Sequence, residues 1–365
     1  MPASSHAVFL AGVFFMFAPA GLLSDIPQMG ASGTARLTAN VLFAGGIAVA
    51  YVIAVRLHPR WLLLVIGVHL LLASQFDRLL GPVAAPLTGD ALRGRLAADV
   101  NGATTSILVS FVLLSHLIRT EGTRYGRVHA EIALARDIHR ALVPRVTRRI
   151  GGFEFLGFSR PSGDVGGDLI DVVESPDGWT GFVADVSGHG VAAGLLMGMV
   201  KSAGRMQLRH GERLDGLLTL LNVVLFDLKS PAMFVTFAGL QFDRSTGLQF
   251  SVAGHLPILC YRPASGTISE LSMPQLPLAM FSDRVFRAKI VAFKPGDLFV
   301  ILTDGLTEVF DARDQEFGLD RVKSIVQNNG VASLEIIEEH VMTAIRSHGR
   351  QLDDQTLLLI RAIAE

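Results

Sequence analysis

The first 120 residues of this 365-residue chain contain no glutamate and no lysine. They include four apolar segments, at about residues 6–23, 37–55, 61–76 and 100–118. A helix needs about 20 apolar residues to cross a bilayer, and the third segment is short for that length. The rest of the chain has the mixed charge of an ordinary globular domain. The sequence therefore predicts a membrane domain over residues 1–119 with about four transmembrane helices, followed by a soluble part.

The arginines predict the orientation of this membrane domain. Four crossings place both ends on one side, and the stretch after residue 118 is rich in arginine, which favours the cytoplasm. The loop between the third and fourth segments also carries arginines (Arg78, Arg93 and Arg95), which opposes this topology. A three-span or re-entrant arrangement is the alternative. We expect a multi-pass protein of the cell inner membrane, in contact with membrane lipid, with its soluble part in the cytoplasm.

Charge and cysteine content exclude several other classes of protein. The formal net charge of −1 predicts no binding to nucleic acid. The lone Cys260 excludes an internal disulfide and a cysteine-based metal cluster. A transporter would carry ionisable residues along its path, and the apolar segments contain almost none apart from His69 and His116.

Residues 120–150 form a predicted linker between the two parts. Val128, Ile132, Ala135, His139 and Leu142 follow a 4-3-4-3 spacing, which is typical of an amphipathic helix. Two interpretations are open. The helix either packs on its own domain or pairs in parallel with a second copy and relays a signal from the membrane; heptads this few do not establish a coiled coil.

From residue 151 the sequence is rich in strand patterns. Residues 233–253 and 257–271 each predict a β-hairpin, with a turn near Gly247 in the first and near Gly266 in the second. Helical patterns cover residues 192–208, 214–228 and 334–345. Strand-rich stretches interrupted by helical blocks indicate stacked sheets covered by helices.

Carboxylates stand at the ends of several strand-like segments. Asp185 ends an apolar run, Asp168 closes a Val-Gly-Gly-Asp segment, Asp304 follows another apolar run, and Asp353 with Asp354 precedes a third. If the segments are neighbouring strands, these side chains converge. Oxygen-only ligands suit Mg²⁺ or Mn²⁺, which keep several waters when bound.

Five motifs occur in the order and approximate spacing of one family. They are PSGDVGGDLID at residues 161–171, DVSGHG at 185–190, VAGH at 252–255, TDGLTE at 303–308 and DDQT at 353–356. Together they resemble the bacterial PPM-type (PP2C-like) serine/threonine phosphatases of the SpoIIE/RsbU kind, over about residues 130–365. The chain departs from the family pattern at Leu169, Ile170 and Leu256, which lie beside the motif residues.

The resemblance implies an α+β fold for residues 151–365, a four-layer α-β-β-α sandwich preceded by the all-α membrane domain and the helical linker. It also implies a centre with two Mn²⁺ or Mg²⁺ ions. The expected metal ligands are Asp168, Asp185, the carbonyl of Val186, Asp304 and Asp353. The roles of Asp353 and Asp354 are interchangeable at this stage, although the first of the pair fits the family pattern better.

Further roles follow from the same resemblance. Asp185 and Asp304 are the expected catalytic carboxylates, since they hold the ions that activate water. His189 is either a proton donor to the leaving group or a structural turn residue, and His255 is expected to be structural. Gly166, Gly167 and Gly188 are expected to let the backbone approach the ions.

The predicted function is a membrane-tethered phosphatase that removes phosphate from serine or threonine of a bacterial regulatory protein. By resemblance, that partner is a STAS-type anti-anti-sigma factor. We also expect a homodimer through the linker helix, if that helix pairs with a second copy. The alternative is a membrane sensor or scaffold whose phosphatase-like domain only binds a partner. The intact carboxylate set favours the enzyme, because a binding module has no need of it.

Overall fold

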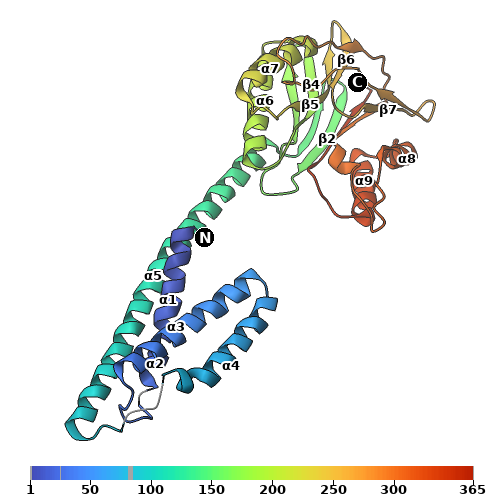
Figure 1. Ribbon diagram of the computed structural model, residues 1–365. Helices are drawn as coiled ribbons and strands as arrows, with labels where there is room; N and C mark the ends of the chain where they lie inside the picture. The colour runs from blue at the N-terminus through green and yellow to red at the C-terminus, as the bar shows by residue number, and fades with distance from the viewer. Residues whose placement is uncertain (1, 25, 81–84, 365) are drawn as a thin grey trace. The chain divides into compact units, whose positions relative to one another are not determined.

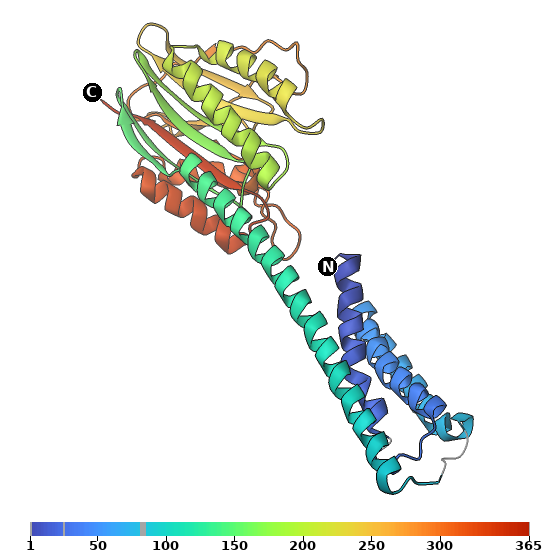
Figure 2. The same ribbon diagram turned by 90° about the vertical axis from the view of Figure 1, so that its left-hand side faces the viewer.

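The computed structural model describes residues 2–24, 26–80 and 85–364 (Figures 1 and 2). It divides into two compact units, Met1–Ala130 and Glu131–Glu365. The boundary falls inside the helix α5 (Gly89–Leu142), which begins in the first unit and ends in the second. The fourth predicted span and the predicted linker helix are therefore one helix. No proline interrupts this stretch, and isolated glycines such as Gly122 only weaken a helix.

The other helices of the first unit are α1 (Ala3–Phe17), α2 (Pro19–Leu23), α3 (Thr34–Leu57) and α4 (Arg60–Leu80). In the described part of the chain, three helical stretches are long and apolar enough to cross a membrane: Ala3–Leu23, Thr34–Leu57 and a part of Gly89–Leu142. The apolar part of α4, Arg60–Gln75, is shorter. The structure thus has a helix at each of the four predicted spans, and three of them meet the requirement by length and composition.

Within this unit, α1 packs on α5 through small and polar residues. The Ser110 hydroxyl donates to the Gly12 carbonyl at 2.8 Å, and the Ser106 hydroxyl donates to the Phe15 carbonyl at 2.7 Å. Large apolar side chains face outward instead, as Leu63 is 74% and Phe111 68% exposed. This distribution is opposite to that of a water-soluble helix bundle.

The second unit contains two antiparallel sheets. In the first, the strand order is β1-β2-β11-β10-β7-β8, and in the second it is β3-β4-β5-β6-β9. The strands of the first sheet are β1 (Val146–Ile150), β2 (Phe153–Arg160), β7 (Ile258–Arg262), β8 (Thr267–Leu271), β10 (Leu298–Leu302) and β11 (Gln355–Ala362). Those of the second are β3 (Leu169–Ser175), β4 (Gly178–Val186), β5 (Val235–Asp243), β6 (Gly247–Ala253) and β9 (Lys289–Ile290).

Helices cover the outer face of each sheet, as Figure 2 shows. The helices α6 (Val191–Arg209) and α7 (Leu214–Leu228) pack on the second sheet, and α8 (Leu319–Asn329) and α9 (Leu334–His348) pack on the first. One apolar core includes Phe155 of the first sheet and Phe182 of the second, and another lies under α8 and α9. The predicted α-β-β-α sandwich is confirmed.

Both predicted hairpins and the three predicted helices of this unit are present, whereas β1 lies where the linker was predicted. Strand β1 pairs with β2 from Val146↔Gly157 to Ile150↔Phe153. It is an edge strand whose central residues, Thr147 to Arg149, are exposed, so its sequence shows no apolar alternation. The helix α8 has only Val322 and Val326 buried, which explains why its pattern was not recognised.

Candidate active site

The two sheets bring four of the predicted carboxylates to one end of the sandwich. Asp185 is the next-to-last residue of β4, and the pairing Leu169↔Ala184 places Asp168 beside it. The pairing Leu302↔Leu357 likewise places the chain at Asp304 near the residues that precede β11. Asp168 and Asp353 thus precede their strands, whereas Asp304 follows β10 and opens the short 3₁₀ helix η1 (Asp304–Leu306).

These carboxylates raise one another's pKa. Burial, followed by the charges of Asp304, Asp353 and Asp354, raises the pKa of Asp185 to about 7. Burial and the charge of Asp353 also raise the pKa of Asp304. Like charges at close range disfavour ionisation, and burial adds to this effect.

Asp168 lies deeper, and the protein supplies hydrogen bonds to it. The side chain is 2% exposed, and its Oδ2 accepts from the hydroxyls of Thr356 at 2.6 Å and Thr303 at 2.8 Å. Burial, followed by the charge of Asp185, raises its pKa well above the ordinary value, while the two hydroxyls act in the opposite direction. Sequence analysis assigned no role to either threonine, although Thr303 and Thr356 both lie inside the recognised motifs.

Asp354 and Asp353 have different surroundings. Asp354 accepts from the backbone N–H groups of Ser162 and Gly167, both at 2.7 Å, and from the Ser162 hydroxyl at 3.0 Å. It therefore fastens the loop that leads to Asp168. Asp353 is exposed, and its Oδ1 accepts from the N–H of Asp354 at 2.7 Å. This difference favours Asp353, not Asp354, as the residue that is free to hold an ion.

The surroundings of the three predicted glycines explain why a side chain is disfavoured at each position. A side chain at Gly166 would collide with the Asp354 carboxylate, and one at Gly167 would lie 2.6 Å from the Val186 carbonyl oxygen. Both glycines thus let the loop pack closely against Asp354 and the Val186 carbonyl, and the expected approach to an ion stays a prediction. Gly188 has open space around it but a φ of 95°, so it is needed for its backbone conformation.

The two histidines of the motifs lie in contrasting places. His189 is exposed and lines a cleft of about 630 Å³ together with Ser162 and Arg350. The ring of His255 shares a 2.8 Å hydrogen bond with the hydroxyl of Thr236, the residue that pairs with Asp185 across β4 and β5. Burial lowers the pKa of His255 to about 4, so it is neutral and supports the strand behind Asp185.

Sequence analysis missed the role of a third histidine. His139, near the end of α5, is 5% exposed and donates a hydrogen bond to the Gly166 carbonyl. Burial lowers its pKa, whereas the charge of Asp354 raises it. Among the described residues, its Nε2 has no hydrogen-bond partner. His139 therefore ties the helix that comes from the first unit to the loop of Asp168.

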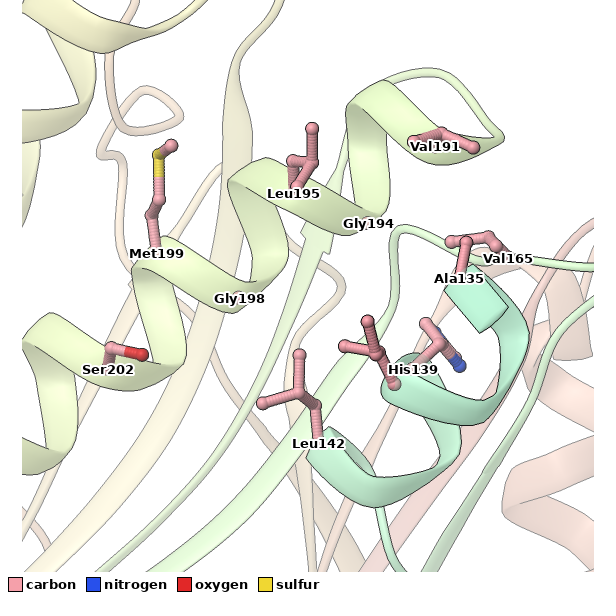
Figure 3. Close-up of a pocket in the computed structure, with 11 residues that line it drawn as sticks. Ala135, His139, Leu142, Val165, Val191, Gly194, Leu195, Gly198, Met199 and Ser202 are labelled. Carbon is pink, nitrogen blue, oxygen red and sulfur yellow. The ribbon is translucent and has the colours of Figure 1, made fainter. Parts of the chain in front are cut away.

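Figure 3 shows His139 at the edge of an apolar cavity between the end of α5 and the first turns of α6. The cavity has a volume of about 400 Å³, and Ala135, Leu142 and Leu195 are among its lining residues. Half of the predicted helical stripe thus faces its own domain, as one of the two interpretations expected. The side chain of Val128, at the start of that stripe, lies outside the described residues. The neighbouring side chains of Leu134 and Ile138 are 61% and 53% exposed, and Ile138 also lines this cavity.

The residues at this site fit divalent cations in their chemistry. In the described ranges, no three Asp, Glu, His or Cys side chains are already arranged as ligands of one ion. Magnesium usually keeps several waters and takes only one or two carboxylates, so it does not require such a group. Cations would also remove the repulsion that raises the pKa of Asp185 and Asp304.

Comparison with known proteins gives a consistent result. The family model described as "Stage II sporulation protein E (SpoIIE)" matches residues 175–363, which include Asp185, Asp304 and Asp353 but not Asp168. The chain is 25% identical over 240 residues to phosphoserine phosphatase RsbU of Bacillus subtilis, covering 64% of this chain and 70% of that protein. It is 23% identical over 288 residues to protein IcfG of Synechocystis, covering 69% of this chain and 45% of that protein.

Two solved structures have a similar fold. The SiaA-PP2C domain of Pseudomonas aeruginosa gives a TM-score of 0.55 at 20% identity, covering 66% of this chain and 98% of that one. The RsbU and RsbW domains of a Mycobacterium tuberculosis protein give 0.54 at 22% identity, covering 62% of this chain and 64% of that one. Both similarities concern the second unit's type of fold.

Proposed function

This chain belongs to the SpoIIE family, its second unit is a PP2C-type serine/threonine phosphatase domain, and we propose that it hydrolyses phosphoserine or phosphothreonine on a bacterial regulatory protein. The observation that carries this proposal is the position of Asp185, Asp304 and Asp353 at one end of the sandwich, where burial and neighbouring carboxylates raise the pKa of Asp185 and Asp304. Such a cluster of carboxylates destabilises the folded protein when no cation is bound, and cation binding would explain why it is there.

We propose that Asp168, Asp185, Asp304, Asp353 and the Val186 carbonyl hold two Mn²⁺ or Mg²⁺ ions. Such ions, when bound, acidify water and neutralise charge on a phosphate ester. Asp185 is central in this assignment because its pKa responds to three neighbouring carboxylates. Asp354 stays outside the ligand set, since the N–H groups of Ser162 and Gly167 already occupy its oxygens.

The protein's own residues supply the remaining functions. His189 is exposed in the cleft beside the carboxylates, where it is accessible to a substrate and can give a proton to the leaving alkoxide. The neutral His255 and Thr236 hold the strand behind Asp185 in place. Asp354 and His139 fix the loop that presents Asp168.

The test is turnover by the full-length protein in detergent or lipid nanodiscs. We expect hydrolysis of p-nitrophenyl phosphate and of a phosphoserine peptide that requires Mn²⁺ or Mg²⁺, stops on addition of EDTA, and is lost in Asp185→Asn and Asp304→Asn. Activity that persists in EDTA, or in both variants, would contradict the assignment of the centre.

We further propose that the first unit spans the cytoplasmic membrane and keeps the phosphatase domain in the cytoplasm. The outward-facing apolar side chains and the three sufficiently long helical stretches support this. Single cysteines introduced at Thr88 and Arg148 test it, because the natural Cys260 is buried. In intact cells a membrane-impermeant maleimide should label Thr88→Cys, which lies outside in the four-span arrangement, and should not label the cytoplasmic Arg148→Cys.

For regulation, we propose a homodimer through α5 and a STAS-type phosphoprotein as substrate. The exposed side chains of Leu134 and Ile138 support pairing of α5, and the similarity to RsbU supports the substrate class. Disulfide crosslinking of Ile138→Cys in membranes tests the dimer. Release of phosphate from a phosphorylated STAS protein, compared with an unrelated phosphoserine protein, tests the substrate.

A further inference from the structure

A cleft lined by arginines lies on the second unit, next to the cleft of His189. It has a volume of about 520 Å³ and is built by the end of α5, the end of β2 with the loop after it, and α9. Its charged lining residues are Arg136, Arg140, Arg145, Arg160, Asp164 and Glu338. Four cations and two carboxylates give the cleft a net charge of +2.

Two of these arginines are already paired. Arg136 lies 3.3 Å from the carboxylate of Asp164, and Arg145 forms a two-bond ion pair with Glu338 on α9. These pairs fix two walls of the cleft relative to each other. They also account for both of its carboxylates.

The other two arginines have no such partner. Among the residues that the structure describes, neither Arg140 nor Arg160 has a carboxylate within ion-pair distance. The guanidinium of Arg160 lies 5.9 Å from the centre of the Phe158 ring, which limits its freedom without neutralising its charge. Both arginines are exposed, so a ligand can reach them.

The position of the cleft connects it with the active site. Gly163 and Asp164 line both this cleft and the neighbouring one that contains His189. The loop they belong to continues directly to Gly167 and Asp168. A polypeptide that places its phosphorylated residue near His189 therefore has its flanking residues within reach of the arginines.

The chemistry of the arginines defines the ligand. Guanidinium groups bind carboxylates and phosphates with paired hydrogen bonds. Bound cations would balance the carboxylates of the active site, and the arginine cleft adds net positive charge that attracts an acidic segment. We propose that the arginine cleft binds an acidic segment that flanks the phosphorylated residue of the protein substrate. This inference rests on the proposed phosphatase function, and it concerns recognition rather than the chemical step.

The test uses full-length protein in nanodiscs of neutral lipid and two phosphoserine peptides, one with aspartates beside the phosphoserine and one with asparagines in their place. Charge-assisted hydrogen bonds contribute about 1.5–3 kcal/mol, which corresponds to roughly 10- to 100-fold in binding. We therefore expect the wild type to have a KM at least about 10-fold lower for the acidic peptide, and Arg140→Glu with Arg160→Glu to remove this preference.

Controls separate recognition from catalysis and from folding. The double variant should hydrolyse p-nitrophenyl phosphate and the asparagine peptide at the wild-type rate. Arg244→Glu makes one such charge reversal at an exposed turn between β5 and β6 and should leave the peptide preference intact. Equal loss on all substrates, or no preference in the wild type, would overturn the proposal.

Binding measurements keep the inference testable without turnover. Fluorescence anisotropy of the labelled peptides should give the same preference, and the same loss in the double variant, even if no hydrolysis occurs. If the protein hydrolyses neither peptide but still binds the acidic one preferentially, the proposed phosphatase function is refuted and the inference about the cleft is not. A last measurement repeats peptide binding in nanodiscs that contain phosphatidylglycerol. If this lipid abolishes peptide binding to the wild type, and if the wild type prefers anionic lipid whereas the double variant does not, the cleft is a lipid site and the substrate proposal fails.

Discussion

The carboxylates at the end of the sandwich lie in two regions whose surroundings differ. Asp168 and Asp354 are buried, and hydroxyls or backbone N–H groups hold them. Around Asp185 and Asp304 the chief influences are burial and neighbouring carboxylates, among them the exposed Asp353. Carboxylates of the first region organise a loop, and we expect those of the second to depend on a bound cation. Substitutions that remove charge should therefore have opposite consequences in the two regions.

The largest expected effect is on the activity of Asp185→Asn. Loss of one electrostatic group at a reaction centre typically lowers the rate by about 100-fold or more, and we expect at least this reduction in metal-dependent turnover. In metal-free protein at pH 8 the same variant should be more stable than the wild type. The pKa of Asp185 is raised to about 7, so its stabilising contribution is lost as the pH rises through that value, whereas asparagine stays neutral.

Thermal unfolding in EDTA, followed by circular dichroism, measures this stability. Adding Mn²⁺ should raise the melting temperature of the wild type and have much less effect on the variant. A variant that melts below the wild type in EDTA would show that Asp185 is held by the protein, and the comparison between the two regions would break down.

The neighbouring residues Asp353 and Asp354 provide the next test. Asp354→Ala leaves the buried N–H of Gly167 without an acceptor, at a cost of about 1–3 kcal/mol, and also removes the part-buried bonds from Ser162. A domain of this size loses about 2–4 °C in melting temperature per kcal/mol. Asp353→Ala should lower activity while leaving the melting temperature in EDTA unchanged. Differential scanning calorimetry of both variants, with turnover on p-nitrophenyl phosphate, separates the two effects; equal destabilisation would contradict the distinction.

Sequence analysis identified the second region better than the first. Asp185, Asp304 and Asp353 lie in short motifs whose residue types suffice to suggest a metal site. The role of Asp354 depends on Ser162 and Gly167, which are 192 and 187 residues away in the chain, and no local pattern encodes such a contact. The same holds for His139. The spacing of the residues around it indicated a helix, but not its hydrogen bond to the Gly166 carbonyl.

The layers of the fold were predictable because strands and helices have their own periodicity. The exceptions have physical reasons. Strand β1 exposes most of its residues at the edge of a sheet, and α8 buries only two of its own. The continuity of α5 was missed because a change from apolar to charged composition was interpreted as a break, although a helix tolerates such a change.

A third prediction concerns the support behind Asp185. The pKa of His255 is about 4 in the folded protein, below the ordinary value of 6.5, so between these values the unfolded chain binds a proton that the folded one excludes. Stability should fall as the pH drops from about 6.5 to 4, by at most about 1.4 kcal/mol per pH unit for this group. The free energy of unfolding, measured with urea at several pH values in this range, should depend less steeply on pH in His255→Gln than in the wild type. An equally steep pH dependence in the variant would mean that His255 is not the group that destabilises the protein at low pH.

The smallest expected effect on stability, and the most informative on the loop, is that of His139→Leu. Leucine removes the bond to the Gly166 carbonyl but also removes the buried Nε2 that has no partner among the described residues, so the free energy of unfolding should change by less than about 1 kcal/mol. The backbone between Gly166 and Asp168 would nevertheless lose its tie to α5. Hydrogen exchange of those amides should become faster in His139→Leu and stay near the wild-type rate in His139→Gln, which keeps a donor. Equal protection in both variants would mean that Asp354 alone holds the loop, and the link between α5 and the first region of carboxylates would then have no support.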